Sequence, residues 1–294
     1  MPSTPPVLPR SFLYVPGIKP DLFPKAAAGP ADAVILDLED AVPVNRKDEA
    51  RTSVQSWLLA QRERPSSRPG TVRQQQWARL NADDFAADLQ CIASTALDGV
   101  FLAKCTASSL QETAGLLADL EAEGRLAPGV GIIGLVEDAA ALMDLVSITG
   151  SRRLVTLGIG EVDLMADLRM SRGATTEPAL DSIRARIVMA CSSAGLSAPV
   201  APTSTDIRDL ESFEQTGRKM QDLGFRSRTA VHPSQVQVIN HVFTPAPDAV
   251  EAAREALAVF DGGSGGVTVD SSGRMIDAAV IRSAQETIAR ASAS

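Results

Sequence analysis

Short apolar runs rich in β-branched residues recur along this chain, and each is followed by a longer segment with the periodicity of a helix. The eight runs span residues 11–16, 33–39, 76–81, 99–104, 131–137, 154–160, 198–203 and 229–233. Several have no polar alternation, as a parallel strand covered on both faces requires. Eightfold alternation of strand and helix predicts an α/β fold, a TIM-type (β/α)8 barrel, with a doubly wound open sheet as the alternative.

The segments between the runs predict helices at residues 20–28, 45–61, 83–96, 107–123, 139–149, 181–194 and 206–223. Proline and glycine mark two loops, at 64–76 and 261–266, and the second separates two later predicted helices, 247–260 and 277–291. We therefore predict a disordered tail at 1–9, a barrel catalytic domain at 10–243, and a small C-terminal helical extension at 244–294. The extension is expected to pack against the barrel or a neighbouring subunit.

Composition narrows the classes of function. The 294 residues, 45% of them hydrophobic, suffice for one large core, and a formal charge of -8 without a dense run of Lys or Arg argues against a nucleic-acid partner. The three cysteines are too scattered for a disulfide framework, which suits a reducing cytosol. The first residues lack a signal peptide, and no apolar run is long enough to cross a bilayer. We expect a cytoplasmic protein without a membrane partner.

In a barrel of this type, the active site lies at the carboxyl ends of the strands. Polar residues end or follow most of the runs: Asp37, Glu39, Asp40, Arg79, Asn81, Lys104, Glu137, Asp163 and His232. Glu137 and Asp163 follow consecutive strands and reach one point near the barrel axis, where carboxylates and several waters suit Mg²⁺. Spacing alone leaves open the alternative that Glu137 begins a helix and Asp163 lies exposed in a loop.

Arg79 interrupts an apolar strand, and a buried arginine needs an anionic partner, which we interpret as a substrate carboxylate. An ion pair with Asp37 or Glu39 at the barrel mouth is the alternative. Asp37 and Glu39 share one face of a strand and bind either Arg79 or a metal-bound water. His232 ends the last run and is either a site residue or a hydrogen-bonded residue that fixes the turn before Pro233.

Several common active-site motifs are absent from the sequence. There is no glycine-rich phosphate loop, no serine nucleophile elbow and no histidine-rich zinc motif. Oxidoreductase, kinase and serine hydrolase functions are therefore disfavoured. The ammonium of Lys104 either steadies an anion or pairs with a neighbouring acid.

A set of motifs occurs in a fixed order: RSFLYVPGIKPDLFPKA, ADAVILDLEDAVP, ARLN, DGVFLAK, LVED, GIGEVDLMADL, TDIRDLESF, GFRSRTAVHPSQ and FTPAPDAVEAA. With these motifs the chain resembles the citrate lyase β-subunit-like branch of the HpcH/HpaI aldolase superfamily, which includes malyl-CoA and citramalyl-CoA lyases. The resemblance extends from about Arg10 to the C-terminus. It implies a (β/α)8 barrel, a bound Mg²⁺, and cleavage or formation of a bond between an acyl-thioester α-carbon and a 2-oxo acid.

The resemblance also implies roles for single residues. Glu137 and Asp163 hold the metal, Arg79 binds substrate oxygens, and Tyr14, Lys19 and Lys25 lie near the CoA portion. An ordinary solvated helix face is the alternative for the lysines. In some relatives an aspartate near the C-terminus acts as an acid or base in an adjacent subunit, and Asp277 in GRMIDAAVI is the candidate here. Its other role is to cap the last helix.

These expectations combine into a retro-aldol hypothesis for a 3-hydroxyacyl-CoA, in which Mg²⁺ binds the substrate and Arg79 stabilises the alkoxide. Asp277, or a water held by Asp37 or Glu39, delivers the proton. The stretch APVAPTS lacks an aspartate found there in many members, so the substrate stays open. The alternatives are a citrate lyase β-subunit acting on citryl-acyl-carrier protein and a non-catalytic CoA-ester binding protein. A homo-oligomer, such as a trimer, is expected.

Overall fold

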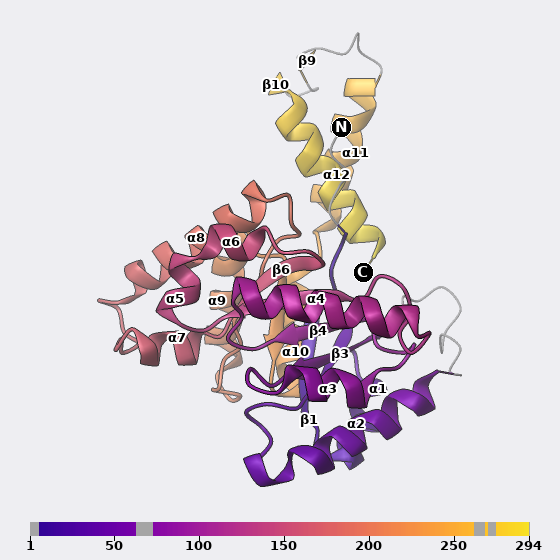
Figure 1. Cartoon of the computed structure of the whole chain (residues 1–294). Coiled ribbons are helices and arrows are strands. Elements are labelled where there is room, and N and C mark those ends of the chain that lie inside the picture. The colour runs from indigo at the N-terminus through magenta and orange to yellow at the C-terminus, as the bar shows by residue number, and fades with distance from the viewer. Residues whose placement is uncertain (1–5, 63–72, 262–267, 270–274, 294) are drawn as a thin grey trace.

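The computed structural model describes residues 6–62, 73–261, 268–269 and 275–293, and its centre is a closed barrel (Figure 1). Eight parallel strands follow one another around it: β1 Ser11–Pro16, β2 Ala33–Asp37, β3 Gln75–Leu80, β4 Gly99–Leu102, β5 Gly131–Val136, β6 Leu154–Ile159, β7 Val200–Ala201 and β8 Ser227–Ala230. Because β1 pairs with both β2 and β8, the sheet has no edge. The predicted TIM-type barrel is confirmed, and the open-sheet alternative is wrong.

Helices surround the strands (Figure 1). They are η1 Pro20–Leu22, α1 Phe23–Ala27, η2 Val44–Arg46, α2 Lys47–Gln61, α3 Phe85–Ile92, α4 Ala107–Ala122, α5 Ala139–Met143, α6 Leu145–Thr149, α7 Glu161–Asp167, α8 Glu177–Ser193, α9 Leu210–Leu223 and α10 Pro233–Phe243. Local sequence explains several of their starts, since Thr106, Asp138 and Asp209 each accept a backbone N–H of the first helical turn. Gly224 ends α9 in the left-handed conformation that glycine adopts without strain.

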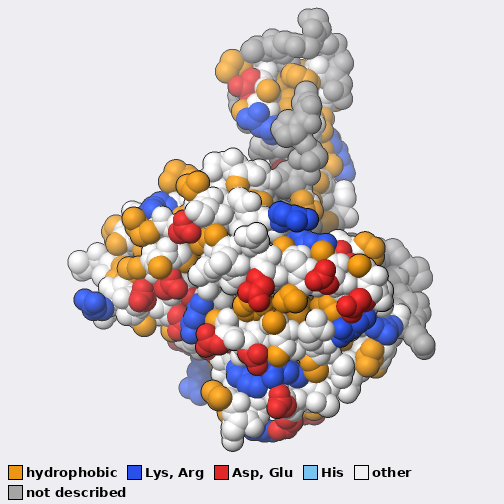
Figure 2. All heavy atoms as spheres, in the orientation of Figure 1, with side chains coloured by type: hydrophobic (Ala, Val, Ile, Leu, Met, Phe, Trp, Pro, Cys, Tyr) orange, Lys and Arg blue, Asp and Glu red, His pale blue; other side chains and the backbone are white. Residues whose placement is uncertain are grey.

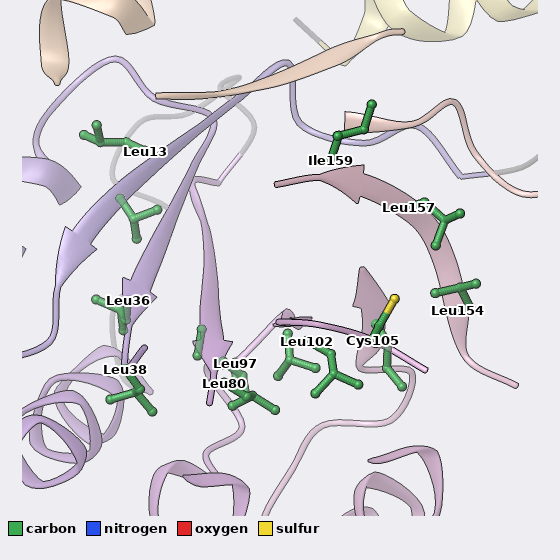
Figure 3. Close-up of a cluster of buried hydrophobic side chains, with 14 of the residues drawn as sticks. Leu13, Leu36, Leu38, Leu80, Leu97, Leu102, Cys105, Leu154, Leu157 and Ile159 are labelled. Carbon is green, nitrogen blue, oxygen red and sulfur yellow. The ribbon is translucent and has the colours of Figure 1, made fainter. Parts of the chain in front are cut away.

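Side chains alternate along each strand between two cores. Inside the barrel, Phe12, Trp77 and Phe101 contact one another edge to face, with ring centroids 5.3 to 5.6 Å apart. On the outer side, buried leucines such as Leu36 and Leu80 point from the strands towards the helices (Figure 3). Aromatic side chains therefore fill the barrel interior, and in a barrel of this type the active site lies at the carboxyl ends of the strands, called the barrel mouth below.

Three local predictions are wrong. Strand β8 ends at Ala230 rather than at Pro233, because Pro233 begins α10 and His232 is its N-cap. Residues 161–167, which were not predicted as a helix, form α7. The described strand β7 has two residues, Val200 and Ala201, because Pro199 and Pro202 flank it and proline has no N–H for a sheet. The loops predicted at 64–76 and 261–266 lie mostly outside the described residues.

After the barrel, α11 Pro247–Asp261 and α12 Ala278–Ser292 form a helical pair that projects away from the barrel (Figure 1). Their shared core contains Ala256, Ile276 and Ile281, and two short strands, β9 Thr268–Val269 and β10 Met275–Ile276, pair between them. Arg226, just before β8, forms an ion pair of 3.0 Å with Glu286 of α12. The pair is therefore attached at the amino ends of the strands, opposite the mouth.

On the face shown in Figure 2, acidic and basic side chains are interspersed over the barrel. Among the described residues, no helix combines the length and the apolar character that crossing a bilayer requires.

Candidate active site

Arg79 is the centre of a buried ion cluster at the mouth. It is 8% exposed, and its Nε and Nη2 donate to the two carboxylate oxygens of Asp37, each at 2.7 Å. Its Nη1 lies 3.0 Å from Asp40 Oδ2 and 2.9 Å from Glu39 Oε2. The pairing follows from the sheet register, because Asp37 and Arg79 are direct neighbours on β2 and β3. The structure thus shows the ion pairs that the sequence offered as the alternative role of Arg79.

Asp37 fixes this arrangement. Besides the two guanidinium bonds, its oxygens accept the backbone N–H groups of Glu39 at 3.0 Å and of Ala41 at 3.3 Å. An ionised carboxylate has about four acceptor positions, so Asp37 has none left for a water. In this geometry Asp37 orients Arg79 and the loop after β2.

Glu39 has a different environment. It is 7% exposed, and among the described residues its Oε2 accepts no hydrogen bond, although Arg79 lies close to it. Burial has the largest effect and raises the pKa of Glu39 to about 8, against the attraction of Arg79 and together with the repulsion of nearby carboxylates. Burial thus favours the protonated form of Glu39, whereas the charge of Arg79 favours the ionised form.

Glu137 follows β5 and is held on two sides. Its Oε2 accepts the backbone N–H of Lys104 at 2.7 Å. Lys104 has a φ of 45°, a left-handed conformation that costs a lysine free energy and here directs its N–H at the carboxylate. On the other side lies Gly160, where an added Cβ would stand 2.3 Å from Glu137 Oε1. Lys104 contacts Glu137 through its backbone N–H, and its side chain is exposed.

Asp163 is exposed and lies in the first turn of α7. The alternative prediction, an exposed position in a loop after β6, is therefore right about exposure and wrong about the loop. Burial raises the pKa of Glu137 to about 7; the Lys104 N–H and Arg79 oppose this shift, and the charge of Asp163 adds to it. Glu137 and Asp163 therefore interact electrostatically at the mouth. Within the described chain, no three Asp, Glu, His or Cys side chains form a complete ligand set. Two carboxylates suit a hard divalent cation that keeps several waters.

The residues expected near the CoA portion differ in position. The Tyr14 ring faces the Arg79 guanidinium at 4.9 Å, and burial raises the pKa of its hydroxyl. Lys19 is exposed directly after β1, at the mouth. Lys25 is exposed in α1, where the neighbouring Ala26 carbonyl accepts a bond from Gln74 at the start of β3. Lys25 therefore lies towards the opposite end of the barrel.

His232 and Asp277 both act as helix caps. The Nδ1 of His232 accepts the Ser234 N–H at 3.2 Å, which matches the alternative role of fixing the turn. Asp277 accepts the N–H groups of Val280 and Ala279 at the start of α12, and these bonds lower its pKa. Because the α11–α12 pair is attached at the amino ends of the strands, Asp277 does not reach the mouth of its own barrel.

An ion network that the sequence motifs do not predict lies beside the mouth. Glu161 begins α7 and accepts bonds of 2.8 and 2.9 Å from Arg184 of α8, which is 2% exposed. Arg184 also binds Glu177 at 2.7 Å and Asp181 at 2.9 Å. A sequence signal exists, since Glu177, Asp181 and Arg184 lie on one face of a helix. The burial of Arg184 depends on distant residues and has no such signal.

Comparison with known proteins agrees with this geometry. The HpcH/HpaI aldolase/citrate lyase model matches residues 10–233. An L-malyl-CoA/beta-methylmalyl-CoA lyase of Cereibacter sphaeroides is 32% identical over 313 residues, covering 98% of this chain and 96% of the relative. A (3S)-malyl-CoA thioesterase of the same species is 30% identical over 290 residues, covering 97% and 95%.

The crystal structure of CitE from Mycobacterium tuberculosis, in complex with magnesium, acetoacetate and coenzyme A, has the same fold. Its TM-score is 0.72 at 29% identity, covering 96% of this chain and 97% of that one. The resemblance drawn from the motifs is confirmed, as is the expectation of a lyase-type enzyme. The chain belongs to the HpcH/HpaI aldolase/citrate lyase family.

Proposed function

We propose that this chain is a Mg²⁺-dependent carbon-carbon lyase that acts on a 3-hydroxyacyl-CoA, such as malyl-CoA or citramalyl-CoA. It cleaves this thioester to an acyl-CoA and a 2-oxo acid, or forms it from them. One observation carries the proposal: at the mouth, Arg79 is fixed by two 2.7 Å bonds to Asp37 and Glu137 is fixed by the 2.7 Å bond from the Lys104 N–H, with Asp163 in the first turn of α7. A guanidinium therefore shares the mouth with two carboxylates of the kind that bind Mg²⁺. The lyase and CoA-complexed relatives support the substrate class.

Glu137 and Asp163 would hold the metal ion. The fit rests on Glu137, whose carboxylate is fixed between the Lys104 N–H and Gly160 and so keeps one orientation without a metal. When bound, Mg²⁺ supplies positive charge that stabilises negative charge on the substrate oxygens.

The protein's own residues supply the other functions. Arg79 is held by Asp37 and binds the substrate hydroxyl oxygen, where it stabilises the alkoxide formed when the hydroxyl loses its proton to solvent. As the carbon-carbon bond breaks, the alkoxide becomes the carbonyl of the 2-oxo acid and the electron pair of the bond passes to the acyl-thioester enolate. The acyl-thioester α-carbon must then receive a proton. Glu39, whose protonated form is favoured by burial, is one donor, and Asp277 of a neighbouring subunit is the other. The proposal therefore includes a homo-oligomer.

The CoA portion is expected along the rim next to β1. Lys19 offers a point charge for a phosphate there, and Tyr14 offers an aromatic face just inside the mouth. We place Lys25 outside this contact because of its position towards the amino ends of the strands.

The test is to mix purified protein with malyl-CoA or citramalyl-CoA and Mg²⁺ and to trap glyoxylate or pyruvate as a phenylhydrazone. We expect one of the two oxo acids to form, and we expect chelation of Mg²⁺ to stop its formation. The proposal fails if neither thioester yields an oxo acid, or if Arg79→Ala yields it at the wild-type rate.

Thioester hydrolysis is a second candidate, favoured by the thioesterase among the relatives. The two reactions release different products, because lysis keeps CoA esterified whereas hydrolysis frees its thiol. Measuring free thiol and oxo acid in the same reaction separates them. Thiol without oxo acid supports the hydrolase, and oxo acid without thiol supports the lyase.

A further inference from the structure

Lys47, the first residue of α2, binds two backbone carbonyls instead of an acid. Its Nζ lies 2.7 Å from the oxygen of Leu38 and 2.7 Å from the oxygen of Glu39. Both carbonyls belong to the loop that follows β2 and carries Glu39 to the mouth. The side chain is partly buried, so these bonds are shielded from water on one side.

A lysine at this position is not explained by the helix. The amino end of a helix carries a partial positive charge, which disfavours a cation and favours acids such as Asp48 and Glu49 in the same turn. The ammonium must therefore be stabilised elsewhere, and the two carbonyl oxygens do this. An ammonium has three donors, and two of them are used here.

The loop after β2 is held from two sides. From the barrel side, Asp37 accepts the N–H groups of Glu39 and Ala41. From the helix side, Lys47 binds the carbonyls, and the Glu39 carbonyl also accepts the Val42 N–H at 3.0 Å. The position of the Glu39 side chain relative to Arg79 thus depends on the Lys47 ammonium as well as on Asp37.

Arg51, one helical turn after Lys47, fixes the neighbouring strand end. Its Nε donates to Asp88 at 2.7 Å, and Asp88 accepts the backbone N–H and the side-chain amide of Asn81 at 2.7 and 2.8 Å. Asn81 follows Arg79 by two residues. Since Lys47 and Arg51 lie on the same face of α2, one helix sets the positions of both partners in the Glu39–Arg79 contact.

We propose that Lys47 is a positioning residue of the site, which holds Glu39 at the distance from Arg79 that the chemistry requires. This inference rests on the proposed function for its catalytic part, because Glu39 is a proton donor there. Its structural part, the fixing of residues 38–42, is independent of that function.

The experiment compares three full-length variants. Lys47→Met removes the ammonium but keeps the length of the side chain, and Lys47→Arg restores donors for the carbonyls. Arg46→Met is the matched control, since Arg46 precedes Lys47 and its guanidinium pairs with the exposed Glu49. Hydrogen exchange of the amides of residues 38–42 is measured by mass spectrometry, and kcat and KM are measured with the active thioester.

In Lys47→Met we expect exchange in residues 38–42 to become at least about 10-fold faster while the strands stay protected. We also expect kcat to fall roughly 10- to 100-fold with KM within about 3-fold, as for a misplaced catalytic group. Lys47→Arg should recover most of both properties, and Arg46→Met should match the wild type.

Unchanged exchange in Lys47→Met overturns the proposal, as does a kcat equal to that of Arg46→Met. A wild-type protein that cleaves none of the thioesters contradicts the proposed function instead, and the exchange measurement then still decides whether Lys47 fixes the loop.

Discussion

Arg79 neutralises buried Asp37 and, in the proposed reaction, also binds the substrate oxygens, and a substitution can separate the two roles. Arg79→Lys keeps the charge but cannot make two parallel bonds to Asp37 and still present a third nitrogen. We expect its kcat/KM to fall by about 100- to 1,000-fold. Arg79→Met leaves Asp37 buried without its partner, and urea unfolding should show a loss of about 3–5 kcal/mol.

The double variant Asp37→Asn/Arg79→Met is the control for this argument, because asparagine removes the charge but keeps an oxygen that accepts the Glu39 N–H. Removing both charges should recover much of the lost stability without recovering activity. A double variant no more stable than Arg79→Met would show that the charge pair is not what the single change disturbs.

Gly160 gives a second prediction at this scale, because it marks where the Glu137 carboxylate must lie. Gly160→Ala places a methyl group 2.3 Å from Glu137 Oε1 and displaces that carboxylate. We expect the Mg²⁺ concentration for half-maximal activity to rise at least about 10-fold. Gly173→Ala is the matched control, since an added Cβ there meets no atom within 4 Å. Equal Mg²⁺ dependence in the two variants would contradict the placement of the metal at Glu137.

The side chains of this site could be predicted from the sequence, whereas the contacts made by its backbone could not. Arg79, Asp37 and Glu39 were named from their places at strand ends, and parallel strands bring such places together. The contributions of Lys104 and Lys47 depend on a backbone N–H and on backbone carbonyls. No residue type encodes either contact, so the sequence could not show them.

At the scale of elements, the predicted barrel followed from apolar runs, and the errors arose where local signals compete. The sequence pattern predicts no helix at residues 161–167, although the acids of the first turn there favour a helix start. At 229–233 the apolar residues continue beyond Ala230, where the strand ends, and this pattern predicts a longer strand. Pro233 instead begins the helix α10. Strand and helix signals overlap in both places, and tertiary packing decides between them.

The ion network that joins α7, α8 and α9 leads to a prediction about pH. Partial burial acts to raise the pKa of Glu177, but Lys219 and Arg184 outweigh it and lower the pKa to about 2, from an unfolded value of 4.5. A lowered pKa means that the ionised form stabilises the fold, so the contribution is complete above pH 4.5 and is lost as pH falls towards 2.

We therefore expect Glu177→Gln to be less stable than the wild type by roughly 1–2 kcal/mol at neutral pH, after allowance for solvent screening. The difference should stay constant down to about pH 5 and shrink below it. Urea unfolding at several pH values measures this, with Glu251→Gln as the control, since Glu251 forms an exposed pair at 3.5 Å. A difference that grows on acidification would reverse the assigned sign.

At the scale of the whole molecule, the two ends of the barrel carry different parts of the proposed chemistry. The mouth holds Arg79, Glu39 and Glu137, whereas the α11–α12 pair is attached at the amino ends by contacts such as Arg226–Glu286. Asp277 is the N-cap of α12, one of the two helices of that pair, which Figure 1 labels. If Asp277 takes part in the reaction, it must do so at the mouth of another subunit.

Mixing two inactive variants tests this. Asp277→Asn keeps an N-cap for α12, since asparagine caps as well as aspartate, but it removes the acid. We expect its kcat to fall about 100-fold or more without a change in thermal unfolding.

The second variant, Arg79→Lys, is inactive because the change lies in the mouth of its own barrel. When the two are unfolded together and refolded at equal amounts, random assembly gives roughly a quarter of the sites an intact Arg79 and an intact Asp277 from different subunits. Recovered activity near that fraction supports action between subunits. Full activity of Asp277→Asn alone would instead leave Glu39 as the proton donor. No recovery on mixing would mean that each chain uses its own Asp277. That result would contradict the argument from the attachment of α11 and α12 at the amino ends of the strands.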